Sequence, residues 1–290
     1  NSSTLVNPVP LVNSPIILPN QPIDTESDKP IVLIVEDNLE VAQVVGGIFD
    51  NKYQLTFATD GKEGFEKAME FIPDLIISDV MMPLMDGFEL CESLKANTLT
   101  SHIPIILLTA KVADESRIAG LKRGADAYMT KPINQAELLL SVENALQSRK
   151  ALKEHYYTNF NEMPSEKTKN ILNIEGIDFD LEDAFIQELL NVLEQKSHDC
   201  DYTIEKLWKD LSISESQLNR KLNGLIGLTL GKTLWTFRLH KAKILLETTT
   251  LTISEVSYQA GFNAPSYFAR KFKEAYNMTP SNFRESGMGT

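Results

Sequence analysis

One stretch, residues 75–80, most constrains what this chain can fold into. It reads Leu-Ile-Ile-Ser-Asp-Val, so an apolar run leads into the carboxylate of Asp79, and a loop with Pro83 and Gly87 follows. An apolar run of this length, bounded by turn residues, is typical of a buried parallel strand. Parallel α/β sheets bind their ligands just beyond the carboxyl ends of the strands, which is where Asp79 would lie. A lone acid there is weak evidence, because many such acids merely cap the next helix.

The segments around this stretch alternate between strand and helix patterns. In addition to the central strand, we expect strands at Ile31–Val35, Gln54–Ala58, Ile105–Thr109 and Ala127–Thr130. Helical patterns are expected at residues 41–49, 61–69, 87–96 and 116–123. Five βα units within residues 30–150 predict an α/β fold, a flavodoxin-like, doubly wound sheet of five parallel strands with right-handed crossovers.

Polar side chains end these strands, and the fold would bring them to one edge of the sheet. They are Glu36, Asp37, Asp79, Thr109 and Lys131. Three carboxylates at one place repel one another unless a hard cation neutralises them, and Mg²⁺ accepts such oxygens in octahedral geometry. A hydroxyl and an ammonium group beside them suit a tetrahedral anion held by that metal. The chemistry implied is phosphoryl transfer to a carboxylate, that of Asp79.

With these side chains in place, residues 30–150 resemble a response-regulator receiver domain along the whole domain. The resemblance implies that Asp79 is the phosphoacceptor. It also implies a Mg²⁺ site in which Glu36 assists through water and the ligands are Asp37, Asp79 and the carbonyl of Met81. The chain would then accept a phosphoryl group and regulate transcription without being an enzyme itself.

The same resemblance assigns roles at the ends of the last two strands. Thr109 and Lys131 would contact the phosphoryl group, and Tyr128 would be the aromatic side chain that swings on activation. Pro132 would follow a cis peptide bond. Taken singly these residues have ordinary alternatives, such as a core position for Tyr128 or a helix cap for Thr109. Their occurrence together makes those alternatives weak.

A second, all-helical domain is expected at residues 184–287, and its helix signals occur in two similar sets. In the first set, Thr203 caps a helix, and Ser214 with Gln217 forms a capping box for the next helix after a short turn. A long helix is expected at residues 228–247. The second set repeats the pattern at Thr252, Glu255, Gly261 and Asn263. The sequence therefore predicts two helix-turn-helix units joined by one long helix.

Charge is distributed unevenly along the chain. The formal net charge is −12, yet residues 201–290 carry twelve Lys and Arg against eight Asp and Glu, which leaves +4. A basic terminal module on an acidic body indicates that only this module meets phosphates. Paired helix-turn-helix units with local positive charge favour DNA binding over the many helical proteins that contain a single such unit.

Residues 184–287 resemble an AraC-type DNA-binding domain. The matching stretches are residues 238–246, 261–268 and 279–284. The second unit fits closely, apart from Asn277 in place of a glycine. The first unit departs from the family at Trp208, Ser212 and Leu230.

The resemblance places two recognition helices, at residues 214–222 and 264–274. Their candidate DNA contacts are Gln217, Asn219, Arg220, Lys221, Ser266, Arg270 and Lys271. Arg and Lys suit guanine edges or phosphates, whereas Gln and Asn suit adenine.

Connecting segments complete the domain plan. Residues 1–29 are rich in Pro, Asn and Ser and predict a linker, and residues 288–290 are a short tail. Residues 151–183 combine an extension of the last receiver helix with a polar, acidic linker, which we expect at residues 158–182. An apolar stripe runs along that helix at Leu138, Val142, Ala145, Leu152 and Tyr156. Its spacing fits either a heptad-type helix pair or a solvated amphipathic extension.

Together these patterns predict a two-component response regulator in which phosphorylation of Asp79 controls sequence-specific DNA binding. Its partners would be DNA and a histidine kinase domain, in trans or on the same polypeptide, and the Pro-rich preface favours the second, hybrid arrangement. We expect phosphorylation to favour a homodimer, with release of a contact between the two domains as the alternative switch. The competing function is a receiver joined to a helical protein-interaction scaffold, a phosphorelay module without DNA binding.

The chain is expected in the cytoplasm, either free or as the cytoplasmic end of a membrane-anchored sensor. No apolar run reaches the about 18 residues of a membrane span, so no membrane contact by this segment is expected. Two unpatterned cysteines, Cys91 and Cys200, fit a reducing compartment.

Overall fold

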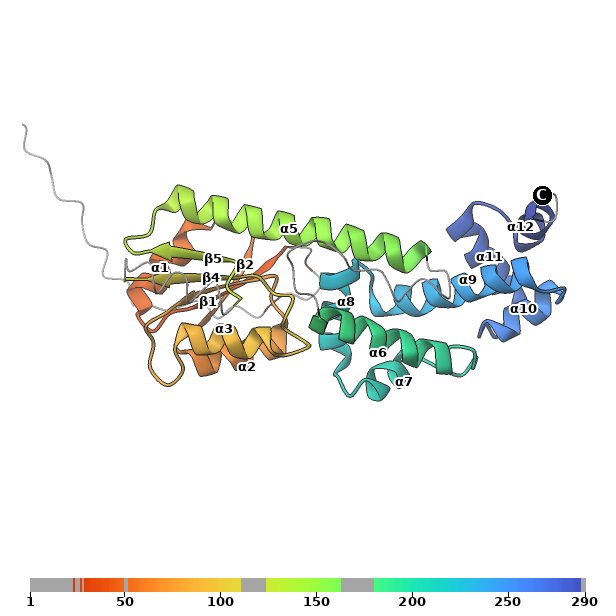
Figure 1. The fold of residues 1–290 in the computed structure, drawn as a ribbon, viewed down its shortest axis with the longest axis horizontal. Helices are drawn as coiled ribbons and strands as arrows, with labels where there is room; N and C mark the ends of the chain where they lie inside the picture. Colours follow the sequence, from red (N-terminus) through yellow and green to blue (C-terminus); the bar gives the residue numbers. More distant parts are fainter. Residues whose placement is uncertain are drawn as a thin grey trace, which may run out of the picture.

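The computed structural model describes residues 29–49, 52–110, 124–162 and 180–287, together with residues 23 and 27. A sheet with its helices occupies one end of the molecule, and a helical region extends from it (Figure 1). The helix expected at residues 116–123 lies outside the described residues, as do residues 1–22 and 163–179 of the two expected linkers. Within the described ranges, no helix is long and apolar enough to cross a membrane.

The sheet has its strands where the apolar runs predicted them. They are β1 (Ile31–Val35), β2 (Gln54–Ala58), β3 (Leu75–Asp79), β4 (Ile105–Thr109) and β5 (Ala127–Thr130). Their order is β2-β1-β3-β4-β5, and every neighbouring pair is parallel. All residues of β1, β3 and β4 are buried, as expected for parallel strands with helices on both faces. The flavodoxin-like fold is confirmed.

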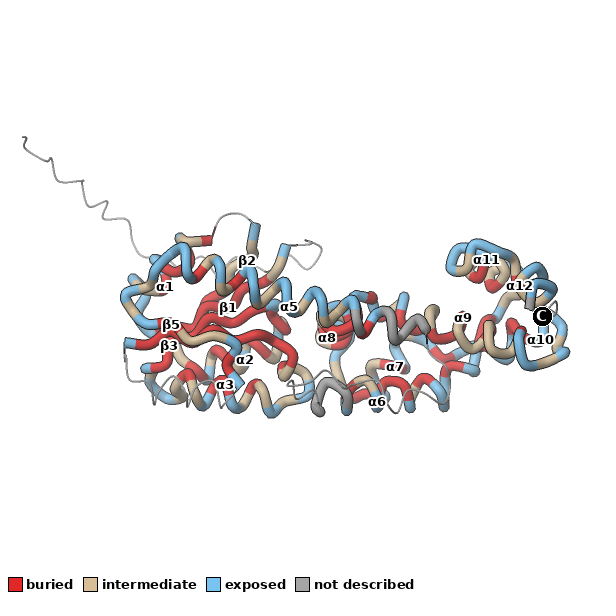
Figure 2. The backbone as a smooth tube through the Cα atoms, turned by 45° about the horizontal axis from the view of Figure 1, so that its top comes forward, coloured by how far each residue is buried: buried red, intermediate tan, exposed pale blue. Residues whose placement is uncertain are grey.

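Helices on both faces of the sheet complete this region. Between the strands lie α1 (Leu39–Ile48), α2 (Gly61–Phe71) and α3 (Gly87–Lys95). Each begins after a side-chain cap, supplied by Asn38, Asp60 and Asp86. Apolar side chains of α2 and α3 pack on one face of the sheet, and those of α1 pack on the other. Figure 2 shows the buried strands between these partly exposed helices.

One long helix, α5 (Gln135–Glu162), joins the sheet to the helical region (Figure 1). Near its start, Leu138 and Val142 are buried against the sheet. Further along, Leu152 and Tyr156 pack into the core of the helical region. The apolar stripe is therefore buried by two cores of the same chain, which contradicts the solvated extension, one of the two alternatives left open by the sequence. Residues 158–162 are helical, although we expected them to begin the second linker.

The helical region spans residues 180–287. Its helices are α6 (Asp180–Lys196), α7 (Ile204–Asp210), α8 (Glu215–Ile226), α9 (Leu230–Thr248), α10 (Ile253–Gln259), α11 (Pro265–Tyr276) and α12 (Pro280–Gly287). One apolar core joins the end of α5 to α6, α7, α8 and the first half of α9. A second core joins the other half of α9 to α10, α11 and α12. Two helix-turn-helix units, α7–α8 and α10–α11, thus share α9, as predicted.

Most of the predicted helix caps are confirmed. Thr203 caps α7, and the expected capping boxes start α8 and α10. The exception is Asn263, because α11 begins at Pro265 after Ala264, whose side chain makes no cap. Proline at the first helical position has no amide hydrogen to satisfy and a φ angle already suited to the helix, so a side-chain cap is less necessary.

The turns inside the two units place different residues in the left-handed backbone region. Gly261, in the turn of the second unit, has a φ of +88°, and a Cβ atom there would lie 1.9 Å from the carbonyl oxygen of Ser197. Only glycine fits at this position. In the first unit Ser212 takes a φ of 56°, so a serine adopts the conformation for which the family uses glycine.

Candidate functional site

The predicted acidic side chains meet at the carboxyl edge of the sheet. Val35 at the end of β1 lies in register with Ser78 in β3, so the residues that follow these strands are neighbours. Carboxylate oxygens of Glu36, Asp37 and Asp79 all lie within 4.8 Å of one another. Glu36 and Asp79 are buried and Asp37 is exposed, so the cluster opens to solvent on one side.

Lys131, just after β5, joins this acidic cluster. Its Nζ lies 2.7 Å from Oε2 of Glu36 and 3.1 Å from Oδ1 of Asp79. Burial raises the pKa of Glu36, and the charge of Asp79 adds to that effect while Lys131 opposes it. Burial alone would lower the pKa of Lys131, but the hydrogen bond to Glu36 and the charge of Asp79 outweigh it and raise that pKa. One ammonium group therefore balances only part of the charge of three carboxylates.

The donor set fits a hard divalent cation. Glu36, Asp37 and Asp79 supply only carboxylate oxygens, and oxygen is the ligand that Mg²⁺ prefers. The amide of Val80 donates to Oδ1 of Asp79 at 2.9 Å, which fixes the orientation of that carboxylate. Met81, whose carbonyl we expected as a further ligand, follows in the loop and is 57% exposed. The residues present are thus compatible with the expected magnesium site.

Of the two expected switch residues, Thr109 lies at the same edge of the sheet as this cluster, and Tyr128 lies within β5, in register with Leu107. Thr109 ends β4 and is buried, and it lies in register with Thr130 of β5, one residue before Lys131. The ring of Tyr128 stacks on Phe88 of α3, with 6.4 Å between the centroids. Among the described residues, none forms a hydrogen bond with the buried hydroxyl group of Tyr128.

The candidate DNA contacts of the first unit lie against the receiver. Gln217 Nε2 donates to the carbonyl of Met69 at 2.8 Å, and Arg220 donates to the carbonyl of Phe71 at 2.7 Å. Lys221 is fully buried, so the expectation that it points outward is wrong for this structure.

Asn219, the fourth candidate in this helix, has a structural role. Its Oδ1 accepts a hydrogen bond from the amide of Leu230 at 2.8 Å, at the start of α9. Helical periodicity alone could not reveal either this contact or those with the receiver, because it says nothing about which other element covers a polar face.

The candidates of the second unit are accessible. Ser266 and Arg270 are exposed and Lys271 is half-buried, while Phe268 and Phe272 face the core. The guanidinium group of Arg270 lies over the ring of Tyr267, 5.1 Å from its centroid. The ammonium group of Lys271 pairs with Glu274 at 2.7 Å. This pair is at the surface, so the ammonium group can exchange its partner for a phosphate at small cost.

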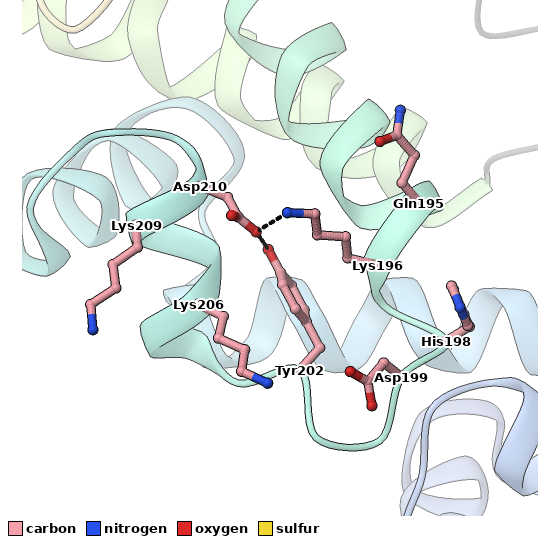
Figure 3. A pocket seen from close by; sticks show the side chains of 8 residues that line it. All are labelled: Gln195, Lys196, His198, Asp199, Tyr202, Lys206, Lys209 and Asp210. Atoms are coloured by element: carbon pink, nitrogen blue, oxygen red, sulfur yellow. Dashed lines mark hydrogen bonds and ion pairs between the residues drawn. The ribbon is translucent and has the colours of Figure 1, made fainter.

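An open pocket of about 450 Å³ lies between the end of α6 and α7 (Figure 3). Asp210 accepts a hydrogen bond from the hydroxyl of Tyr202 at 2.8 Å and pairs with Lys196 at 2.9 Å. Lys209 is likewise paired, with Glu205. Because much of its charge is already balanced by neighbours, we assign no ligand to this pocket.

Comparison with known proteins agrees with these two regions. Residues 32–143 match the response regulator receiver domain family, and residues 207–286 match a family described as a helix-turn-helix domain. Over 90% of its length, the chain is 34% identical to histidine kinase P4 of Formosa agariphila. Over 43% of its length it is 42% identical to hybrid signal transduction histidine kinase D of Dictyostelium discoideum. Over 53% it is 34% identical to the response regulator ArlR of Staphylococcus saprophyticus.

The chain spans 18%, 8% and 61% of the lengths of these three relatives. Each family match falls on a region whose fold agrees with it: the parallel sheet for the first, the paired helix-turn-helix units for the second. We conclude that this chain joins a response regulator receiver domain to an AraC-type helix-turn-helix domain, the domain composition of a two-component response regulator.

Proposed function

We propose that this chain is a transcription regulator whose DNA binding is controlled by phosphorylation of Asp79. The observation that carries the proposal is the convergence of Asp79 with Glu36, Asp37 and Lys131 at one sheet edge, beside a buried Thr109. In this proposal the receiver spans residues 30–150, the connecting segment residues 151–183 and the DNA-binding domain residues 184–287, as predicted from the sequence.

In the proposed reaction a carboxylate oxygen of Asp79 attacks the phosphorus of a phosphohistidine. The P–N bond of the donor breaks as the aspartyl phosphate forms. Glu36, Asp37, Asp79 and the carbonyl of Met81 would hold Mg²⁺, which neutralises the charge gathered at the site. Lys131 and the Thr109 hydroxyl would then contact the phosphoryl oxygens, with Lys131 exchanging its bond to Asp79 for one to the new anion.

The phosphoryl donor is proposed to be a histidine kinase domain. Two of the relatives above carry histidine kinase in their names, one of them as a hybrid. These names support a kinase on the same polypeptide, with a kinase in trans as the alternative.

The assignment of Asp79 is tested by intact-mass spectrometry after incubation with acetyl phosphate. We expect one acid-labile phosphoryl group, formed only with Mg²⁺ and absent from Asp79→Asn. Lys131→Ala should still accept the group slowly but should not transmit the signal. An acid-stable phosphate, or equal labelling of Asp79→Asn, contradicts the assignment.

The DNA-binding half is tested on the exposed second unit. Arg270→Ala and Lys271→Ala should each reduce the slope of log affinity against log salt by about one for every phosphate that the substituted side chain neutralised. A variant that removes a base contact should instead weaken binding by about 1–3 kcal/mol at its cognate site only.

A protein-binding scaffold is the second candidate function, favoured by one observation. Three of the four candidates in α8 contact the receiver, and the fourth, Asn219, contacts the start of α9. This alternative predicts no salt-dependent DNA affinity in either phosphorylation state, so the salt titration separates the two functions.

A further inference from the structure

The polar face of α8 lies on the receiver rather than in solvent. Gln217, Arg220, Lys221 and Gly224 are spaced three or four residues apart and so share one face of the helix. The adjacent apolar face, with Leu218, Leu222 and Leu225, is buried in the core of the first unit. Figure 1 shows α8 at the junction between the sheet region and α9. The face that a recognition helix must offer to DNA is therefore already covered.

The receiver presents hydrogen-bond acceptors to this face. The carbonyls of Met69 and Phe71, in the last turn of α2, accept from Gln217 and Arg220 at 2.8 and 2.7 Å. Carbonyls in the last turn of a helix lack partners within the helix and lie at the negative end of its dipole. An amide and a guanidinium group thus meet here the kind of partner that base edges and phosphates offer in DNA.

A buried pair of side chains, Lys221 and His102, also contributes to the contact. Lys221 Nζ lies 2.9 Å from Nδ1 of His102, in the loop before β4, and both residues are almost inaccessible to solvent. Burial, followed by the charge of Lys221, holds the pKa of His102 well below its usual value, so its ring is neutral and accepts the hydrogen bond from the ammonium group. A Cβ atom on Gly224 would lie 3.0 Å from Nε2 of His102, so the backbone of α8 approaches the receiver closely.

Repulsion between positively charged side chains beside the contact limits its strength. A cavity of about 200 Å³ beside it is lined by four cations, Arg149, Lys150, Lys153 and Arg220, and by one carboxylate, Asp74. Burial lowers the pKa of both Lys153 and Arg220, only partly offset by Asp74. Like charges gathered in a partly dry cleft disfavour closure. The contact is therefore suited to open and close rather than to hold permanently.

We infer that the unphosphorylated receiver blocks DNA binding by the first helix-turn-helix unit, using the carbonyls of α2 and the ring of His102 as substitutes for the acceptors of DNA. This inference rests on the proposed function and names its regulation. A recognition helix must enter the major groove with its polar face towards the base edges, so α8 cannot contact the receiver and DNA at once. The second unit stays accessible, so the closed chain engages DNA with α11 alone.

The docking surface lies at the opposite edge of the sheet from Asp79. Phe71 and His102 precede β3 and β4, whereas Asp79 ends β3. α2 reaches both edges, because a Cβ atom on Gly61 at its start would lie 2.3 Å from the carbonyl oxygen of Met85, in the loop after Asp79. A shift of that loop would therefore move the helix whose other end holds α8.

Amine labelling followed by mass spectrometry measures the contact directly in the full chain. Lys206 on α7 and Lys273 on α11 are exposed and serve as internal controls. We expect Lys221 of the unphosphorylated protein to react at least about ten-fold more slowly than Lys206, since a mostly closed population reacts only through its open fraction. Adding beryllofluoride with Mg²⁺ should raise the Lys221 rate towards that of Lys206. Equal rates before activation overturn the inference.

Receiver-side variants then separate occlusion from DNA recognition. His102→Ala removes the acceptor of Lys221, whereas His102→Asn places an amide oxygen near the position of Nδ1 and serves as the matched control. We expect His102→Ala to accelerate Lys221 labelling and to raise affinity for a random-sequence 40-bp duplex pool about ten-fold or more without phosphorylation. His102→Asn should stay close to wild type in both measurements.

The outcomes distinguish this inference from the function on which it rests. Faster Lys221 labelling in His102→Ala with measurable but unchanged DNA affinity overturns the occlusion alone. Failure of every protein and state to bind the duplex pool, even with Lys221 exposed, overturns the proposed DNA-binding function and the occlusion with it. Labelling of the wild-type protein requires no substitution, so misfolding of a variant cannot obscure the result.

Discussion

At the scale of single residues, two positions are tightly constrained by their surroundings. The buried ring of His102 lies 2.9 Å from the ammonium group of Lys221 and also faces Arg149 and Lys95 from two other helices. Gly261 is the backbone equivalent, because the carbonyl of Ser197 occupies the space that a side chain would need. Each permits a prediction with a matched control.

Acidification should weaken the closed structure through His102. Its pKa is depressed in the folded chain, so below about pH 6.5 an exposed imidazole takes up a proton that His102 does not. The stabilisation is therefore complete above that pH and falls by about 1.4 kcal/mol per unit below it, until the depressed pKa is reached. Urea titrations at pH 7.5 and 5.5 should show a larger loss for wild type than for His102→Asn, by about 1 kcal/mol. Equal losses would remove His102 as the titrating group.

Gly261→Ala should be far more damaging than alanine at an unconstrained glycine. At Gly261 the new Cβ meets a carbonyl oxygen at 1.9 Å and the φ angle is left-handed, so we expect a loss of about 3 kcal/mol or more. Gly47 in α1 has no atom within 4 Å of a Cβ position, and Gly47→Ala should stabilise by up to about 1 kcal/mol. Thermal unfolding of the two variants compares them, and similar melting temperatures would contradict the required left-handed turn.

At the scale of elements, α5 is the part that sequence periodicity described least well. The strands were predictable, because a short apolar run between turn residues in an α/β domain is typical of a buried strand. The acidic edge was also predictable, because parallel topology brings the carboxyl ends of the strands together. The stripe on α5 was ambiguous, because Leu138 and Tyr156 contribute the same periodicity although they enter different cores. The contact between α8 and the receiver could not be predicted from the sequence, because Gln217, Arg220 and Lys221 suit DNA and helix-end carbonyls equally well.

Interrupting α5 between its two cores should release α8 from the receiver. Ser148 is exposed, between the sheet-facing and the core-facing turns of the helix. Ser148→Pro removes a helical hydrogen bond and adds a clash, at a cost of about 3 kcal/mol, which kinks the helix. Lys221 should then label as fast as Lys206 without activation, while Ser148→Ala should leave it protected. Continued protection in Ser148→Pro would mean that α8 is held by the receiver surface alone.

At the scale of the whole molecule, the elongated arrangement places the acidic edge with Asp79 in the sheet region, α8 at its junction with the helical region and α11 at the far end (Figure 1). The apolar stripe of α5 is buried within the chain, so a dimer built on that stripe would have to open existing cores. Release of α8 leaves both cores intact but requires α5 to bend between them.

Dimerisation on activation stays a prediction that sedimentation can decide. With beryllofluoride and Mg²⁺, tens of micromolar protein should shift towards the mass of a dimer if phosphorylation pairs two chains on neighbouring half-sites. A mass that stays monomeric while DNA affinity rises would make release of α8 the whole switch.

The central claim is that phosphorylation of Asp79 controls DNA binding, and fluorescence anisotropy with a labelled 40-bp duplex pool tests it most directly. Wild type and Asp79→Asn are titrated with and without acetyl phosphate and Mg²⁺ at fixed salt. The account predicts that acetyl phosphate raises the affinity of wild type about ten-fold or more, as expected when a mostly closed population is opened, and leaves Asp79→Asn unchanged. Equal affinity of wild type in both conditions, with the aspartyl phosphate confirmed by mass, would contradict it.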